Sequence, residues 1–238
     1  MNISPTTTSF AGFPKVARLS REMIVTEKID GTNAQIFIWD ERYQVTRPGA
    51  DLLTDAGRPP DGVPFVWTAG CMSVAAGSRT QWITPANDNH GFVKWVLANV
   101  EQLVYLGHGR HFGEWWGSGI NRGYGLSKGE KRLSLFNTIR WAPHGTAPQR
   151  IVTGDPRIEK FQDVLPTCVG LVPIMDRGLF STGECKNALE QLRIHGSVAA
   201  PGYMNPEGIV VFHTASGSCF KKTLAGDGKP KRTFVSQL

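Results

Sequence analysis

The alternation of apolar and polar positions along the chain predicts many short strands and few helices. Apolar and β-branched runs bounded by turn residues indicate strands over residues 23–29, 34–40, 111–117, 133–141, 208–213 and 219–224. Gly31-Thr32-Asn33 stands between the first two runs, so we expect a β-hairpin there. Residues 46–62 are rich in glycine, proline and aspartate and are expected to form a loop.

Two stretches have the spacing of helices. Residues 91–106 place apolar side chains at helical intervals, and Gly107 is positioned to end that helix. Ser181 and Glu184 have the spacing of a capping box before a second helix, residues 185–194. Because strands predominate and no regular βα alternation occurs, the sequence predicts an α+β fold with largely antiparallel sheets.

Composition narrows the class of protein. With 238 residues, 40% of them apolar, the chain is expected to form a single domain over residues 1–238. It holds no run of about 18 apolar residues, which argues against a membrane span, and its first residues lack the pattern of a secretory signal. The four cysteines are scattered without a CxxC pair, which disfavours a zinc site and suits a reducing cytoplasm.

The balance of charge points to an acidic partner. Lysine and arginine exceed aspartate and glutamate by 26 to 20, which gives a net charge of +6. Residues 221–232 concentrate cations and are read either as a strip that binds a phosphate backbone or as a solvated tail. Residues 117–125 form a glycine-rich loop that suits either a phosphate contact or a flexible hairpin.

The sharpest local signal is Lys28-Ile29-Asp30-Gly31. A lysine at the end of an apolar strand, followed by Asp-Gly at a tight turn, presents an amine that can act as a nucleophile. The alternative is a surface lysine beside an ordinary Asp-Gly turn, and this pattern alone does not decide between the two.

Six segments in order give the sequence a resemblance to the covalent nucleotidyltransferase superfamily, and most closely to bacteriophage RNA-ligase-2-like enzymes. The matching segments are Lys28-Ile29-Asp30-Gly31-Thr32-Asn33, Gly77-Ser78-Arg79-Thr80, Phe112-Gly113-Glu114-Trp115-Trp116-Gly117, Leu135-Phe136-Asn137, Pro206-Glu207-Gly208-Ile209-Val210-Val211 and Phe220-Lys221-Lys222-Thr223. The resemblance implies the ligase adenylation fold. It also implies an ATP-dependent RNA ligase that joins 3′-OH and 5′-phosphate ends through lysyl-AMP and an adenylylated 5′ end.

The same resemblance assigns roles to individual residues. It implies catalytic roles for Lys28, Lys221 and Asp30 and metal contacts, with Mg²⁺ or Mn²⁺, for Glu207 and Glu114. Contacts with ATP are implied for Glu27, Asn33, Arg79, Glu114, Phe136, Glu207 and Lys222. Structural roles remain open for each, such as turn orientation for Asp30 and core filling for Phe136.

Two departures from the family pattern matter. The family pattern has one residue between its two lysines, whereas Lys221 and Lys222 are adjacent. They therefore point to opposite faces of a strand. We favour Lys221 for the phosphate contact, with a second cation from Lys229 or Lys231. Fourteen residues follow Leu224, which leads us to expect no OB domain.

We therefore expect a monomeric RNA ligase that acts in RNA repair and binds RNA, nicked or single-stranded, and no membrane. A small DNA ligase, a nucleotidyltransferase with another acceptor and an inactive nucleic-acid-binding protein of the same fold are the alternatives.

Overall fold

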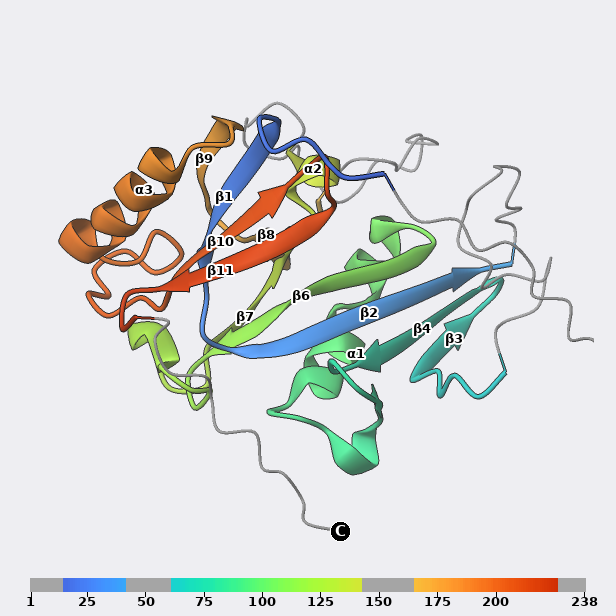
Figure 1. Cartoon of the computed structure of the whole chain (residues 1–238). Coiled ribbons are helices and arrows are strands. Elements are labelled where there is room, and N and C mark those ends of the chain that lie inside the picture. Colours follow the sequence, from blue (N-terminus) through green and yellow to red (C-terminus); the bar gives the residue numbers. More distant parts are fainter. Residues whose placement is uncertain (1–14, 42–60, 143–164, 227–238) are drawn as a thin grey trace, which may run out of the picture.

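Two β-sheets form the framework of the computed structural model, which describes residues 15–41, 61–142 and 165–226 (Figure 1). Strands predominate over helices, and all strand pairs but one are antiparallel. The predicted α+β class with largely antiparallel sheets is confirmed. Within these described ranges, no helix is long and apolar enough to cross a bilayer.

The smaller sheet, which we call sheet A, has the strand order β11-β10-β1-β9. Its strands are β1 (Glu22–Lys28), β9 (Ile174–Leu179), β10 (Gly208–His213) and β11 (Ser218–Thr223). Helix α3 (Thr182–His195) covers one face of this sheet, where Leu189 and Leu192 pack against Met23, Val25 and Ile209.

The larger sheet, sheet B, has the order β3-β4-β2-β6-β7-β8, with β5 paired to β4. Its strands are β2 (Thr32–Asp40), β3 (Trp67–Ala69), β4 (Met72–Gly77), β5 (Trp82–Ile83), β6 (Gly109–Gly117), β7 (Lys131–Leu135) and β8 (Val169–Leu171). Helix α1 (Phe92–Leu103) covers one face, and its apolar stripe joins the largest core cluster. The exception to the antiparallel pairing is β7 with β8.

The predicted hairpin between the first two strands is wrong. β1 pairs with β9 and β10 in sheet A, whereas β2 pairs with β4 and β6 in sheet B. The chain crosses from one sheet to the other over Ile29, Asp30 and Gly31 (Figure 1). Ile29 is buried with Trp116 and Tyr124, so this short crossing is anchored in the interior.

Gly31 is required at this crossing by space. A Cβ atom there would lie 2.4 Å from the carbonyl oxygen of Trp115 and 2.7 Å from the Cβ atom of Trp116. Any larger residue would therefore push the crossing away from β6.

Other predicted boundaries are corrected by side-chain capping. The strand expected over 133–141 ends at Leu135, because Asn137 accepts a hydrogen bond from the Arg140 N–H and starts the short helix α2 (Thr138–Trp141). Ser181 caps α3 as predicted, by accepting from the Glu184 N–H. Most of the loop expected over 46–62 lies outside the described residues.

Candidate functional site

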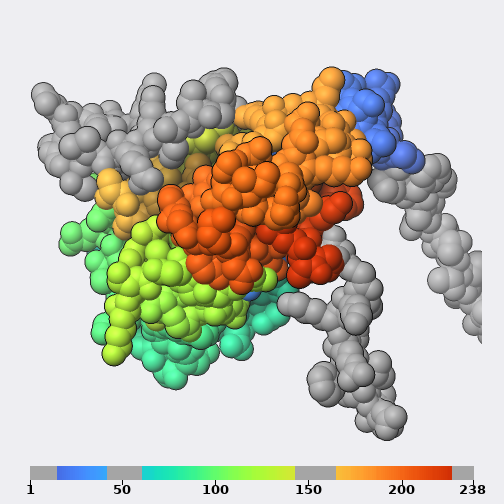
Figure 2. All heavy atoms as spheres, turned by 90° about the vertical axis from the view of Figure 1, so that its left-hand side faces the viewer, coloured from blue at the N-terminus to red at the C-terminus, as the bar shows by residue number. Residues whose placement is uncertain are grey.

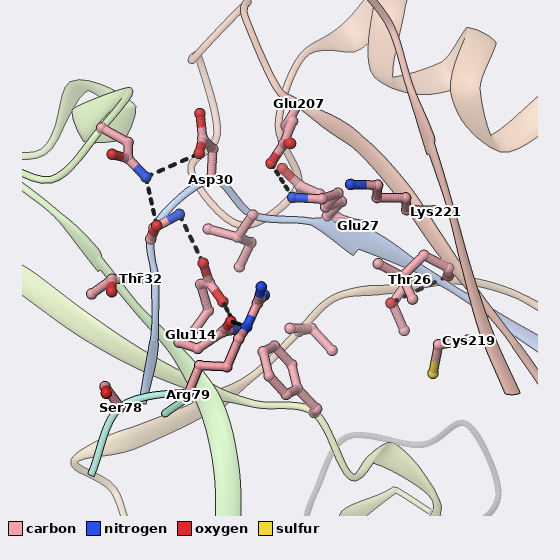
Figure 3. Close-up of a pocket in the computed structure, with 18 of the residues that line it drawn as sticks. Thr26, Glu27, Asp30, Thr32, Ser78, Arg79, Glu114, Glu207, Cys219 and Lys221 are labelled. Atoms are coloured by element: carbon pink, nitrogen blue, oxygen red, sulfur yellow. Dashed lines mark hydrogen bonds and ion pairs between the residues drawn. The ribbon is translucent and has the colours of Figure 1, made fainter. Parts of the chain in front are cut away.

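A cleft of about 950 Å³ lies where the two sheets meet at the crossing (Figure 3). Sheet A and the segment before β10 contribute Glu27, Lys28, Glu207 and Lys221, and sheet B and its loops contribute Asn33, Arg79, Glu114 and Phe136. Asp30 comes from the crossing itself. The cleft thus gathers nine of the ten residues predicted for the site, and Lys222 is the exception.

The amine of Lys28 stands at the end of β1, within the cleft. It forms an ion pair with Oε2 of Glu207, and both side chains are largely shielded, at 23% and 16% exposure. Gly208, next to Glu207, pairs with Lys28 across β1 and β10. The register of these two strands therefore fixes the distance between the amine and the carboxylate.

Asp30 is held by the glycine-rich loop after β6. Its Oδ2 accepts from Nε of Arg122 at 2.9 Å, and its Oδ1 accepts from Nδ2 of Asn121 at 3.0 Å. Its backbone N–H donates to the hydroxyl of Tyr124 at 2.8 Å. With both carboxylate oxygens engaged, Asp30 is placed to fix the crossing.

Arg122 also reaches the segment that precedes β10. Its Nη1 donates to the carbonyl oxygen and to Oδ1 of Asn205, at 3.1 and 2.9 Å. In Figure 2 the orange segment that leads to β10 lies directly against the yellow-green loop. One guanidinium therefore links Asp30, two residues after Lys28, with Asn205, two residues before Glu207.

A chain of hydrogen bonds runs along the sheet B side of the cleft. Nε of Arg79 donates to Oδ1 of Asn33 at 2.6 Å, and Nδ2 of Asn33 donates to Oε2 of Glu114 at 3.1 Å. Oε1 of Glu114 accepts from the Gly31 N–H at 3.0 Å. Each donor fixes the next side chain, so this wall is oriented before any ligand binds.

Glu114 is a buried carboxyl group, at 8% exposure. Loss of hydration on burial raises its pKa to about 7, against the lowering effects of the Gly31 N–H and the charge of Lys28. The nearby carboxylates of Glu207 and Asp30 raise it further. Glu114 therefore titrates near neutral pH.

Glu27 lies next to Lys28 and borders the cleft, while its carboxylate is bound by the loop after α3. It is 1% exposed, and its carboxylate accepts from the Ser197 hydroxyl at 2.6 Å and from the Val198 and Ala199 N–H groups at 2.8 Å each. Burial raises its pKa, and these three hydrogen bonds oppose that rise. The carboxylate thus ties β1 to the loop after α3, and the predicted contact with ATP stays a prediction.

The two adjacent lysines of β11 divide between two faces of sheet A. Lys221 pairs with Val210 and lines the cleft, whereas Lys222 pairs with Ile209, whose side chain packs in the core under α3. Lys222 lines a separate groove with Phe180 and Cys185. Lys229 and Lys231 lie outside the described residues, as does most of the basic tail.

Phe136 follows directly after β7 at the rim of the cleft. Its ring is 42% exposed, so it offers an apolar face to the cleft instead of filling the core. An adenine ring is a fitting occupant for such a face.

Among the carboxylates of the cleft, Glu207 is the best placed to bind a metal ion. Both oxygens of Glu114 and of Asp30 accept hydrogen bonds within the protein. Oε1 of Glu207 has no hydrogen-bond partner within the described part of the chain. In the same part no cluster of three or more metal-binding side chains occurs, so Mg²⁺ would keep several waters here, as it commonly does.

Several residues of the site were not predicted from sequence. Asn121 and Ser197 hydrogen-bond to the predicted residues Asp30 and Glu27, and Asn205 is linked to Asp30 through Arg122. Two members of the glycine-rich loop, Asn121 and Tyr124, adopt positive φ angles of 42° and 52°, a strain that is commonly found at functional sites. In the sequence, only the glycine content of this loop indicated that it could belong to the site.

A family model described as RNA ligase matches residues 21–223. A search of curated proteins found no match. Among solved structures, two variants of Naegleria gruberi RNA ligase with ATP and Mn are similar at 14% and 16% identity, with TM-scores of 0.45 and 0.46. A variant with AMP and Mn has 16% identity and a TM-score of 0.45.

Each of these alignments covers 86% of this chain and 50% of the other, so the chain spans about half the length of the structures it matches. The family model, in contrast, covers most of the chain, from the residue before β1 to the end of β11. The chain belongs to the RNA ligase family.

Proposed function

We propose that this protein is an ATP-dependent RNA ligase that joins 3′-OH and 5′-phosphate ends through lysyl-AMP at Lys28. The observation that carries the proposal is the amine of Lys28, which lies in a cleft against Glu207 with Lys221 on the same face of the neighbouring strands. Membership of the RNA ligase family supports the same reaction.

In the first step, Nζ of Lys28 attacks the α-phosphorus of ATP. The Lys28 ammonium first releases a proton to water. The free amine then forms an N–P bond as the bond between this phosphorus and the pyrophosphate oxygen breaks, and the N–H proton displaced also goes to water. Lys221 supplies positive charge to the phosphate oxygens, where charge develops in the transition state. Glu207 holds the amine in position through its ion pair.

In the second step AMP passes from the protein to the RNA, and in the third step it is released. An oxygen of the 5′-phosphate attacks the same phosphorus, the N–P bond breaks, and Lys28 recovers its protons. A 3′-hydroxyl then attacks the 5′-phosphorus and expels AMP. Arg79, exposed at the cleft and held by Asn33, is positioned to contact the phosphate of the RNA end.

A divalent metal fits the oxygen donors of this site. Glu207 would hold it, mainly through water, and bound Mg²⁺ or Mn²⁺ would neutralise charge on the phosphates. The α-phosphate of ATP and the carboxylate of Glu207 would then both lie next to the Lys28 amine. We also propose that the rejoining of broken ends serves RNA repair.

Incubation with α-labelled ATP and Mg²⁺ tests the first step. We expect label on the parent protein and none on Lys28→Ala, with mass spectrometry to identify the AMP adduct. Lys15→Ala, a change at an exposed lysine before β1, is the matched control and keeps the label. An adduct on Lys28→Ala would refute the assignment of the nucleophile.

A ligation panel tests the acceptor. Single-stranded RNA, nicked RNA duplexes and the corresponding DNA substrates are compared with the same adenylylated protein. Joining of RNA ends supports the proposal, whereas joining of DNA alone would identify a DNA ligase. A protein that binds strands but takes no label would be an inactive binding protein.

A further inference from the structure

A row of side chains on sheet B continues beyond the cleft on the same face. Across β2 and β6, Asn33 pairs with Glu114, and Gln35 pairs with Phe112. Alternate residues of a strand face the same side, so Phe112 and Arg110 share the face of Glu114, and Gln35 shares it with Asn33. We call Gln35, Arg110 and Phe112 the sheet ledge.

Phe112 is the exposed apolar group of this ledge. Its side chain is 52% exposed although it lies in the middle of a strand whose following residues are buried. Its carbonyl oxygen accepts from the Phe136 N–H at 2.9 Å, so Phe136, itself 42% exposed, is its neighbour just after β7. Both phenyl rings are therefore partly exposed to solvent, Phe136 at the cleft rim and Phe112 on β6.

Arg110 is a cation that the protein holds in place. Its Nη1 donates to Oε1 of Gln35 at 3.1 Å, and its guanidinium lies 5.0 Å from the ring centroids of both Phe37 and Trp82. Nε2 of Gln35 donates in turn to the carbonyl oxygen of Ser78 at 3.2 Å. Because Arg110 is already ordered by these contacts, a ligand that binds it loses little additional side-chain entropy.

A second cation, Arg140, also lies near Phe112. A hollow of about 60 Å³ is lined by Arg110, Phe112, Asn137 and Arg140, among others, and no carboxylate lines it. On this face of the described strands β2, β4 and β6, the only carboxylate is that of Glu114, in the cleft. The ledge therefore combines an exposed aromatic ring with cations and lacks acidic groups.

We propose that the sheet ledge binds one nucleotide of a single-stranded RNA substrate, with its base stacked on Phe112 and its phosphate next to Arg110. The proposal rests on the proposed function, since it extends the ligase site by one subsite. Base stacking on an aromatic ring beside ordered cations is a common means of binding single strands. Phe136 remains for the adenine of ATP, one strand away.

Binding of a labelled, unstructured oligoribonucleotide, followed by fluorescence anisotropy without ATP, tests the ledge. We expect Phe112→Ala to raise the Kd for RNA roughly 5- to 100-fold, the range for loss of one base–aromatic stack. Phe112→Trp keeps the stack and the parent affinity. Ile194→Ala, a change at an apolar residue of α3 that is 49% exposed, is the matched control and leaves the Kd unchanged.

The KM for ATP in self-adenylylation separates the ledge from the ATP site. In Phe112→Ala the Kd for RNA is expected to change by a much larger factor than this KM. Equal changes in both would overturn the proposal and assign the ring to the ATP site. An unchanged Kd for RNA would overturn it as well.

The same measurements distinguish failure of the ledge from failure of the proposed function. A protein that binds RNA through Phe112 but never forms an AMP adduct retains the ledge and refutes the ligase. A protein that forms the adduct and binds RNA equally well with Phe112→Ala retains the ligase and refutes the ledge. Arg110→Gln should also reduce the slope of log K against log salt by about 0.7, the value for one single-strand phosphate contact.

Discussion

At the scale of single residues, Glu114 shows how burial determines the chemistry of the cleft. It is shielded from water, and its two oxygens accept from the Gly31 N–H and from Asn33. Its pKa is raised to about 7, chiefly by the loss of hydration. The folded protein therefore holds a proton on this carboxyl group in a pH range where the unfolded chain does not.

We expect this proton to give stability a measurable pH dependence. Between pH 4.5 and 7, the unfolded chain releases the Glu114 proton and the folded protein keeps it, so the free energy of unfolding falls as pH rises. The loss across this window is about 1–3 kcal/mol, after which the contribution is constant. Denaturant unfolding of the parent and of Glu114→Gln, at matched pH values, measures the difference. Parallel curves for the two proteins would contradict a raised pKa.

Most of the predicted site residues do line the cleft, whereas the partners that hold them could not be named from the sequence. Lys28, Asp30 and Glu207 stand in short local patterns that are visible in one dimension. Arg122 and Ser197 reach Asp30 and Glu27 across 92 and 170 positions, and such contacts depend on how the sheets are placed. The loop after α3, which binds the carboxylate of Glu27, was likewise not foreseen from the sequence, and the predicted contact of Glu27 with ATP stays a prediction.

At the scale of elements, β11 determines which lysine enters the cleft. Its register places Lys221 beside Val210, on the cleft face, and Lys222 beside Ile209, on the α3 face. The strand was predicted from its apolar pattern, and the opposite orientation of adjacent residues follows from strand geometry alone. The groove under Lys222 could not be predicted, because it depends on where α3 packs.

We therefore expect Lys221→Ala and Lys222→Ala to differ in the first step. Loss of the Lys221 charge should slow lysyl-AMP formation by roughly 10²-fold, because that charge acts on the transition state. Lys222→Ala should leave the rate of this step close to that of the parent. Single-turnover adenylylation of both variants measures this. The reverse order would mean that β11 is shifted by one residue in solution.

The glycine-rich loop after β6 acts on the site through Arg122. Its guanidinium joins Asp30 to Asn205 and so relates the positions of Lys28 and Glu207. We expect Arg122→Ala to lower the kcat of self-adenylylation by roughly 10-fold or more with a smaller change in KM, since small displacements of reacting groups are costly. Arg122→Lys should not restore it, because an ammonium cannot reproduce the fork of a guanidinium.

Arg132→Ala provides the control for this prediction. Arg132 also lies on sheet B and forms an ion pair with Glu130, but it is exposed and away from the cleft. Its removal should leave kcat unchanged. If Arg122→Ala lowers only the Tm and not kcat, the contact is structural and the positioning role is wrong.

At the scale of the whole molecule, the net charge of +6 is expected to make strand binding sensitive to salt. Arg79, Arg110 and Lys221 are the cations of the cleft and the ledge that we expect to contact phosphates of the strand. Three phosphate contacts predict a slope of about −2 for log K against log salt on single strands. Titrations of RNA binding at several salt concentrations measure it, and a flat dependence would show that other contacts hold the strand.

The division of the strands between two sheets could not be predicted from the sequence. Asp30-Gly31 has the composition of a hairpin turn, and local pattern could not reveal that the two flanking strands choose partners far away in the chain. Burial of Ile29 and the close approach of Gly31 to β6 fix the crossing, and both are properties of the tertiary structure.

This crossing has a mechanical consequence. The lysine that would carry AMP is the last residue of a strand in sheet A, while Phe136, Asn33 and Arg79 approach from sheet B. A nucleotide attached to Lys28 would therefore touch both halves of the protein and act as a removable brace between them. The adenylylated protein would resist separation of its halves more strongly than the free protein, and each turnover would add and then withdraw that reinforcement.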